Sequence, residues 1–228
     1  MKYNTLLFDV DNTLLDFDAN EGESFKSLIR DKGEIYSEEL YEVYKKINQG
    51  MWADIELGKI KVDEVLNTRF SKLMSEYGKS IEGGEWEKTY RLYLNQGVQL
   101  MPDAHEVLSK LHEKYTLYIV TNGIARTQYS RINGAGISQY FKDCFISEDI
   151  GANKPAIEFF NYVKDHVKGF NEAETLIIGD SITSDIKGGN LAGIDTCWFC
   201  KEGTVNESSI SPNYEIHSLK ELLQILWW

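Results

Sequence analysis

Short runs of apolar residues alternate with longer amphipathic segments along much of the chain. Four runs have the length of buried strands: Thr5–Phe8, Thr116–Thr121, Thr175–Gly179 and Thr196–Phe199. They are apolar at nearly every position, and helix-like segments separate the later ones. Strands of this kind are typical of parallel sheets that helices cover on both faces. The pattern therefore predicts an α/β fold built on a parallel sheet.

A different pattern fills the part of the chain between the first two predicted strands. Helical spacing of apolar residues dominates there, as in Glu38–Gln49 and Val62–Tyr77, and no strand-like run interrupts it. We therefore predict two domains. Residues 1–15 and 96–228 form the α/β core, and residues 16–95 form an inserted helical cap. Because the insert follows the first strand directly, we expect it to act as a lid over the ends of the strands.

Charge and composition narrow the range of partners. The 228 residues include 24 basic and 36 acidic side chains, which gives a formal net charge of −12. This charge disfavours binding to nucleic acid polymers or anionic membranes. No apolar run approaches the ~20 residues of a membrane span, and the first residues have no signal-peptide core. We expect a cytoplasmic protein, a monomer or weak homodimer, that acts on a small molecule.

The cysteines and histidines give no clear pattern. Three cysteines, Cys144, Cys197 and Cys200, are too few for a disulfide framework. Cys197 and Cys200 have C-x-x-C spacing, but on a strand their sulfur atoms would point to opposite faces. Without a second C-x-x-C or a nearby pair of histidines, we interpret Cys197 and Cys200 as small buried hydrophobic residues. No chemistry is assigned to the scattered histidines: His105, His112, His166 and His217.

Acidic residues stand where two of the predicted strands end. Asp9 and Asp11 follow the first strand, and Asp180 and Asp185 follow the run that ends at Gly179. The carboxyl ends of parallel strands meet at one edge of a sheet, so we expect these acids to converge. Converging carboxylates repel one another and a phosphate group unless a hard cation neutralises them, and Mg²⁺ prefers oxygen ligands. The acids therefore predict a magnesium and phosphoryl site, although a simple turn would also suit Asp9 and Asp11.

Four motifs occur in a fixed order: Asp9-Val10-Asp11-Asn12-Thr13-Leu14, then Val120-Thr121-Asn122-Gly123, then Asn153-Lys154-Pro155, and finally Gly179-Asp180 through Asp185. With these motifs the chain resembles the haloacid dehalogenase superfamily, in its phosphatase branch with a helical cap inserted after the first motif. The resemblance covers nearly the whole length. It implies a Rossmann-like parallel sheet core, a Mg²⁺ cofactor and the hydrolysis of phosphomonoesters.

The resemblance also implies roles for individual residues. Asp9 would be the nucleophile that forms an aspartyl-phosphate, and Asp11 would be the general acid and base. The phosphoryl oxygens would be bound by Thr121, Asn122 and Lys154. The metal would be held by Asp9, Asp11 through its backbone carbonyl, Asp180 and Asp185, with Asp185 either a direct ligand or a support for one.

Residues of the predicted cap indicate the substrate. The segment that contains Asn48 and Trp52, together with Gly58 and Arg69, is similar to the cap of pyrimidine 5′-nucleotidases, which act on nucleoside monophosphates such as UMP, dUMP and dTMP. An aromatic ring and an amide would suit a planar base through stacking and hydrogen bonding. Trp52 also fits the buried stripe of a helix, so a purely structural role stays open.

Other functions keep the same core residues. A phosphatase of a sugar phosphate or phosphoglycolate, or a phosphomutase, would differ only in the cap. The resemblance implies that dehalogenases lack the second acid that Asp11 supplies here, which disfavours that activity. A phospho-accepting signalling module also uses an aspartate, magnesium and a lysine, but such modules are shorter and lack a large helical insert.

Overall fold

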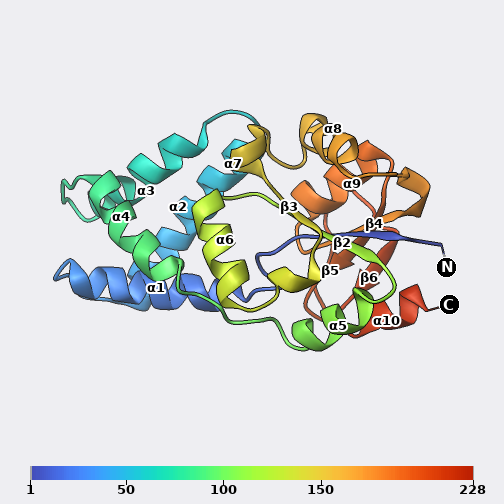
Figure 1. Cartoon of the computed structure of the whole chain (residues 1–228). Helices are drawn as coiled ribbons and strands as arrows, with labels where there is room; N and C mark the ends of the chain where they lie inside the picture. The colour runs from blue at the N-terminus through green and yellow to red at the C-terminus, as the bar shows by residue number, and fades with distance from the viewer. Residues whose placement is uncertain (1, 228) are drawn as a thin grey trace. The chain divides into compact units, whose positions relative to one another are not determined.

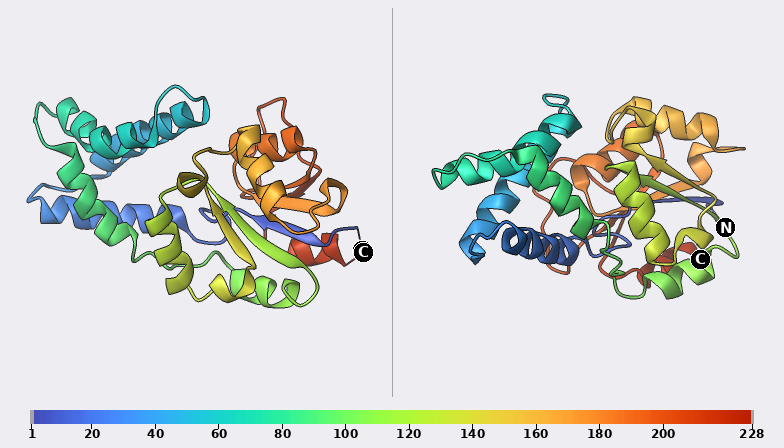
Figure 2. Two further views of the ribbon diagram at one scale, coloured as in Figure 1. Left: turned by 45° about the horizontal axis from the view of Figure 1, so that its top comes forward. Right: turned by 60° about the vertical axis from the view of Figure 1, so that its left-hand side comes forward.

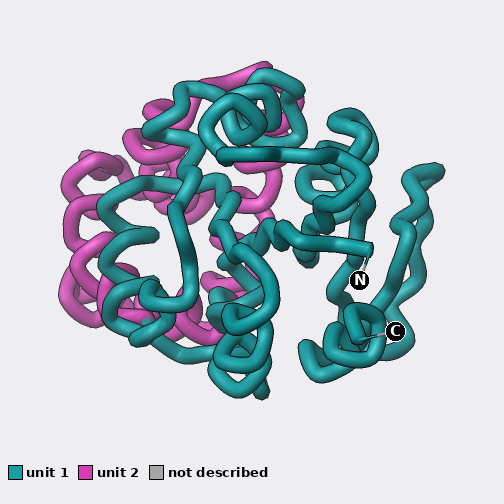
Figure 3. The backbone as a smooth tube through the Cα atoms, turned by 45° about the vertical axis from the view of Figure 1, so that its right-hand side comes forward, with its two compact units in different colours: residues 1–17, 98–228 teal, residues 18–97 magenta. Residues whose placement is uncertain are grey.

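The computed structural model describes residues 2–227 and divides into two compact units (Figure 3). The first unit comprises residues 1–17 and 98–228, and the second comprises residues 18–97. The boundaries predicted from the sequence lie two residues earlier at each end of the insert. The first unit contains the sheet, and the second is built from helices.

The sheet of the first unit has six parallel strands in the order β3-β2-β1-β4-β5-β6 (Figure 1). The strands are β1 (Thr5–Phe8), β2 (Thr116–Thr121), β3 (Asp143–Ile146), β4 (Thr175–Gly179), β5 (Asp195–Phe199) and β6 (Tyr214–Ile216). Along the chain, β2 and β3 are added in turn on one side of β1, and β4, β5 and β6 are added in turn on its other side. The predicted parallel α/β fold is thus confirmed, and the reversal of strand order places the expected ligand crevice beside β1 and β4.

Alternating side chains of the strands bury both faces of this sheet. Leu6 and Phe8 pack with helices α5 (Ala104–Leu111) and α10 (Glu221–Leu226) and with Ile132 of α6 (Ala125–Gly134). Leu7 points the other way and packs with α8 (Ile157–His166) and α9 (Lys187–Ala192). Helices therefore lie on both faces (Figures 1 and 2). The remaining helical pieces are α7 (Ser147–Ile150), two 3₁₀ turns, Ser138–Tyr140 and Glu172–Glu174, and a π-helical turn, Ile182–Ile186.

The chain leaves and re-enters the first unit along two paired segments. The Asp16 N–H donates to the Gln99 carbonyl at 2.9 Å, and the Met101 N–H donates to the Leu14 carbonyl at 2.9 Å. Leu15 and Leu100 form an antiparallel bridge between these bonds. The two points where the insert is attached therefore lie side by side.

The second unit contains helices α1 (Phe17–Asp31), α2 (Glu38–Glu56), α3 (Val62–Glu76) and α4 (Gly83–Leu94). The first residue of α1, Phe17, still belongs to the first unit. Its core is aromatic: the rings of Tyr44 and Phe70 stack with centroids 5.5 Å apart. No strand occurs among residues 18–97, as the helical spacing predicted. Across residues 2–227, no helix has the length and apolar character needed to cross a membrane.

Candidate active site

The loop after β1 carries the first two acids. The Asp9 N–H donates to the Ile178 carbonyl at 2.9 Å, so the pairing of β1 with β4 continues one residue beyond the strand. The loop then closes on the Val10 carbonyl, which accepts from three N–H groups further along the chain, at 3.3, 2.9 and 2.9 Å. Asn12 has φ 59°, a left-handed conformation that asparagine tolerates better than most residues. This tight turn fixes Asp9 and Asp11 at the carboxyl edge of the sheet.

Lys154 is buried among acceptors at the same edge. Its Nζ donates to Asp9 Oδ1 at 2.8 Å, to Asp185 Oδ1 at 2.6 Å and to the Val120 carbonyl at 2.7 Å. These bonds use all three protons of the ammonium group, and the side chain is only 1% exposed. Burial opposes the charge, but Asp185 and Asp9 outweigh it and raise the pKa of Lys154. The lysine therefore stays charged and links two strand ends.

The three carboxylates around this lysine form a candidate metal centre. Asp9, Asp180 and Asp185 each offer an oxygen, and these atoms lie within 4.8 Å of one another. Burial raises the pKa of Asp9 to about 7; Lys154 opposes the rise, and repulsion by Asp185 adds to it. Burial, with repulsion by Asp9 and Asp185, also raises the pKa of Asp180. One lysine cannot balance three carboxylates, and a set of oxygen donors is what Mg²⁺ prefers, so the residues fit the predicted ion.

Asp185 is held from two sides. Its Oδ2 accepts from the Ser181 N–H at 3.1 Å, while Oδ1 is bonded to Lys154. The side chain also packs against the backbone of β4, because a Cβ added at Gly179 would lie 2.2 Å from the Asp185 carboxyl carbon. Only glycine fits this approach. Asp185 therefore orients Lys154, whether or not it also contacts a metal ion.

The end of β2 reaches the site through Thr121 and Asn122. The Asn122 side chain pairs with the backbone of Lys154: its Nδ2 donates to the carbonyl at 2.9 Å, and its Oδ1 accepts from the N–H at 2.8 Å. The Thr121 hydroxyl accepts from Gln128 Nε2 at 2.8 Å. Both residues therefore lie at the site, and Asn122 positions the backbone of Lys154. Their contacts with a phosphoryl group stay predictions.

Two residues of α6 that the sequence analysis missed hold Asp11. Gln128 Nε2 donates to Asp11 Oδ2 at 3.0 Å, and Arg131 Nη1 donates to Asp11 Oδ1 at 2.5 Å. Both side chains are buried although both are polar. Their spacing of three residues puts them on one face of the helix, and this spacing directly after the second motif is the signal that could have revealed them. Together they fix the orientation of the Asp11 carboxylate.

The predicted cap residues lie inside the second unit. Arg69 binds Glu87 through two bonds of 2.8 and 2.7 Å and donates to Asn48 Oδ1 at 2.9 Å. Asn48 in turn donates to Glu21 Oε1 at 2.8 Å, and all four side chains are buried. Trp52 is apart from this network, half-buried against an apolar cluster of α2 and α3. The structure thus joins Asn48 to Arg69 but not to Trp52, and base contact by any of the three stays a prediction.

Comparison with known proteins identifies the family of the chain. The family model described as haloacid dehalogenase-like hydrolase matches residues 6–199, which include all four motifs. The chain belongs to this family. The predicted resemblance is thereby confirmed. Asp9, Lys154 and Asp180 all lie in the part of the chain that the family model covers.

The Bacillus subtilis HAD-hydrolase YfnB is 48% identical over 225 residues, which cover 99% of this chain and 96% of YfnB. A crystal structure of YfnB bound to magnesium matches with a TM-score of 0.94 and covers 99% of both chains.

Two further relatives have names that state a substrate class. The pyrimidine 5′-nucleotidase PynA of Streptococcus pneumoniae is 40% identical over 227 residues, covering 99% of this chain and 96% of PynA. The pyrimidine 5′-nucleotidase YjjG of Escherichia coli is 28% identical over 226 residues, covering 99% of both. Each match extends over both units of the structure.

Proposed function

We propose that the protein is a magnesium-dependent phosphatase that hydrolyses phosphomonoesters through an aspartyl-phosphate, and that its substrates are pyrimidine nucleoside monophosphates such as UMP, dUMP and dTMP. The observation that carries the proposal is the buried ammonium group of Lys154, which binds both Asp9 and Asp185 beside Asp180. A site of this charge pattern suits a phosphoryl group, because an anionic nucleophile can approach phosphorus only where positive charge offsets the repulsion.

In the first step, an Asp9 carboxylate oxygen attacks phosphorus and forms the aspartyl-phosphate, while the bond between phosphorus and the ester oxygen breaks. The leaving oxygen takes a proton from the carboxylic acid of Asp11. Lys154 supports the attack in two ways. It fixes the direction of the Asp9 carboxylate through the 2.8 Å bond, and its positive charge beside Asp9 would offset the negative charge of an approaching phosphoryl group. The hydroxyl of Thr121 adds a donor at the neighbouring strand end.

In the second step, water attacks phosphorus of the aspartyl-phosphate, Asp11 takes a proton from this water, and the bond between phosphorus and Asp9 breaks. Inorganic phosphate leaves and Asp9 is restored. The contacts of Asp11 with Gln128 and Arg131 support this step, because they hold the ionised carboxylate that must accept the proton.

A magnesium ion would be held by Asp9, Asp180, Asp185 and the backbone carbonyl of Asp11, where it supplies positive charge to the phosphoryl oxygens. The magnesium-bound structure of YfnB, which is 48% identical, supports this choice of ion. The substrate class rests on PynA and YjjG, both pyrimidine 5′-nucleotidases that match the chain over 99% of its length.

The catalytic proposal is tested with phosphate release from UMP in the presence of Mg²⁺. Asp9→Asn should lose activity to the background level and keep its circular dichroism spectrum. Asp165→Asn, which changes an exposed aspartate on α8, is the matched control and should behave like the wild type. Asp11→Asn should still bind UMP and lose roughly 10²–10⁴-fold in kcat, the usual contribution of a general acid and base. A folded Asp9→Asn protein with normal turnover would refute the nucleophile.

The substrate is tested by kcat/KM for UMP, dUMP and dTMP against AMP, GMP and phosphoglycolate under one set of conditions. A site built for one ring should reject a two-ring base, because the poor fit leaves polar groups of the site unpaired. Each unpaired group costs about 1–3 kcal/mol, and about 1.4 kcal/mol corresponds to a tenfold change in kcat/KM. We expect UMP to exceed AMP by at least about tenfold. Equal values for AMP and UMP, or a preference for phosphoglycolate, would remove the nucleotidase assignment and leave the phosphatase core intact.

A further inference from the structure

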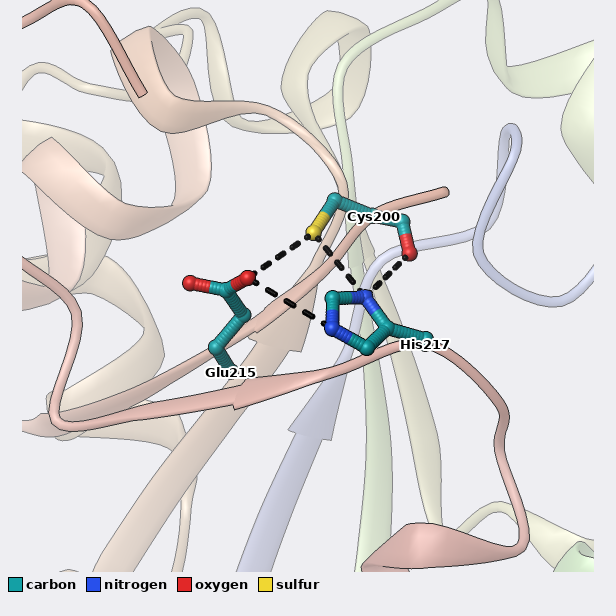
Figure 4. Close-up of side chains that lie close together, drawn as sticks. All are labelled: Cys200, Glu215 and His217. Atoms are coloured by element: carbon teal, nitrogen blue, oxygen red, sulfur yellow. Dashed lines mark hydrogen bonds and ion pairs between the residues drawn. The ribbon is translucent and has the colours of Figure 1, made fainter. Parts of the chain in front are cut away.

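A second group of side chains that could hold a metal ion lies at the edge of the sheet where β5 pairs with β6. Cys200, Glu215 and His217 each offer one ligand atom, and these atoms lie within 4.8 Å of one another (Figure 4). Cys200 Sγ is 3.7 Å from Glu215 Oε1 and 3.6 Å from His217 Nδ1, and His217 Nε2 is 3.7 Å from Glu215 Oε1. None of these residues takes part in the proposed phosphatase chemistry.

The parallel pairing of β5 and β6 creates this cluster. Trp198 pairs with Glu215 and Phe199 with Ile216, and the Cys200 N–H extends the ladder by donating to the Ile216 carbonyl at 3.0 Å. Because side chains alternate along a strand, Glu215 and His217 project from one face, which Cys200 shares. Glu215 comes 15 positions after Cys200 in the sequence, so short motif spacing could not reveal the group.

The C-x-x-C spacing itself plays no part. Cys197 packs in the cluster that contains α5 and α10, whereas Cys200 packs with Trp198 and Ile186 in a different one. The two sulfur atoms therefore face opposite sides of the sheet, as the sequence predicted. The partners of Cys200 come from β6 and the residue after it, and not from the neighbouring cysteine.

The histidine already has the orientation that metal-bound histidines favour. His217 Nδ1 lies 3.2 Å from the Cys200 carbonyl, which accepts a hydrogen bond when the ring proton is on Nδ1. This tautomer leaves the lone pair of Nε2 as a ligand on the side of Glu215, in the usual arrangement in which the second ring nitrogen of a metal ligand donates to a carbonyl. In Figure 4 the ring lies between the Cys200 carbonyl and the Glu215 carboxylate.

The spacing of the ligand atoms suits zinc. With Zn–S near 2.3 Å and Zn–N or Zn–O near 2.0–2.2 Å, tetrahedral geometry separates neighbouring ligand atoms by roughly 3.3–3.6 Å. The separations of Oε1 from Sγ and from Nε2, 3.7 Å each, are close to this range, whereas Sγ lies 3.6 Å from the protonated Nδ1 and must turn toward Nε2 to complete the set. Small side-chain rotations would close them onto an ion. Glu215 and His217 are 45% and 37% exposed, so an ion can enter from solvent and the side chains are free to adjust.

We propose that Cys200, Glu215 and His217 bind one zinc(II) ion, with water in the fourth position, and that this ion clamps the edge strand β6 to β5. A thiolate, an imidazole and a carboxylate suit a borderline-soft cation such as zinc, whereas the three carboxylates at Asp9 suit magnesium. Ligand chemistry thus separates the two sites. On binding, Cys200 releases its thiol proton and coordinates as the thiolate.

The test uses the full chain, freed of metal and then kept in excess Mg²⁺ to occupy the carboxylate cluster. Cobalt(II) is titrated as the probe, because a thiolate bound to cobalt gives a charge-transfer band that oxygen ligands do not give. We expect the band to saturate at one equivalent and to disappear when zinc is added, since zinc binds such sites more tightly than cobalt. Absence of the band, or its persistence after zinc is added, would overturn the proposal.

Variants assign the band to these residues. Cys200→Ser should abolish it, whereas Cys144→Ser, which changes a partly buried cysteine of β3, should keep it. His217→Gln and Glu215→Gln, both at partly exposed positions, should weaken cobalt binding by at least about tenfold. Zinc should also raise the melting temperature of the wild type and Cys144→Ser by more than that of His217→Gln. A band retained in Cys200→Ser, or unchanged affinity in both glutamine variants, would refute the site.

Discussion

Replacing Lys154 by methionine keeps an unbranched side chain of similar length but removes the ammonium group that joins Asp9 to Asp185. The variant leaves two buried carboxylates and the Val120 carbonyl without the donor they share, at 2.8, 2.6 and 2.7 Å in the wild type. Breaking a buried ion pair by removing one partner costs about 3–5 kcal/mol. A domain of this kind has only about 5–15 kcal/mol of stability in total. The loss should therefore be a large fraction of the free energy of unfolding.

The measurement is urea unfolding in EDTA, combined with hydrogen exchange of the β1 and β4 amides, which reports on the unit that holds Lys154. Lys164→Met is the matched control, because Lys164 is partly exposed and its 3.0 Å pair with Glu172 should contribute less than about 1 kcal/mol. Added Mg²⁺ should restore part of the loss in Lys154→Met by bringing positive charge back to the carboxylates. Equal stability of Lys154→Met and Lys164→Met in EDTA would refute the reasoning.

Two further predictions concern a buried acid and a glycine. Burial raises the pKa of Glu21 from 4.5 to about 7, so between these values the folded state keeps a proton that the unfolded chain has lost, and stability falls as the pH rises. At ~1.4 kcal/mol per pH unit, this loss of stability amounts to about 3 kcal/mol, and Glu21→Gln should abolish it. Melting curves recorded from pH 4 to 8 measure the loss, and an unchanged pH dependence in Glu21→Gln would contradict the prediction. Gly179→Ala places a Cβ 2.2 Å from the Asp185 carboxyl carbon and should cost about 1–3 kcal/mol and slow phosphate release. Gly50→Ala, in open space on α2, should instead add roughly 0.5–1 kcal/mol; equal effects of the two glycine variants would count against the steric argument.

The central strands could be predicted from the sequence, and the edge strands could not. β1, β2 and β4 match the predicted ranges and β5 starts one residue earlier, because each is a continuous apolar run buried on both faces. β3 and β6 were missed. β6 spans only Tyr214–Ile216, with an exposed glutamate at its centre. Such a segment forms a strand because β5 pairs with it. This pairing cannot be predicted from the sequence of the segment itself.

The candidate site could likewise be predicted only in part from the sequence. The structure brings Asp9, Lys154, Asp180 and Asp185 together, and this convergence follows from the rule that parallel strands end at one edge. The burial of Arg131 could not be predicted, because an arginine on a helix is usually exposed. Its position depends on packing against the loop of Asp11, a contact made across 120 residues of sequence. Similarly, Cys200 gained its partners only through the pairing of two strands.

The adjacent attachment points of the insert have a consequence for how this family can diversify. Leu15 and Leu100 are bridged in the first unit, so the ends that a shorter or different insert would have to join are already next to each other. Closing such a gap costs little loop entropy, and each doubling of the inserted length adds only about 0.6 kcal/mol. We therefore expect that residues 18–97 can be exchanged for another helical module while the sheet keeps its fold. One core could thus carry different helical inserts at this single pair of attachment points.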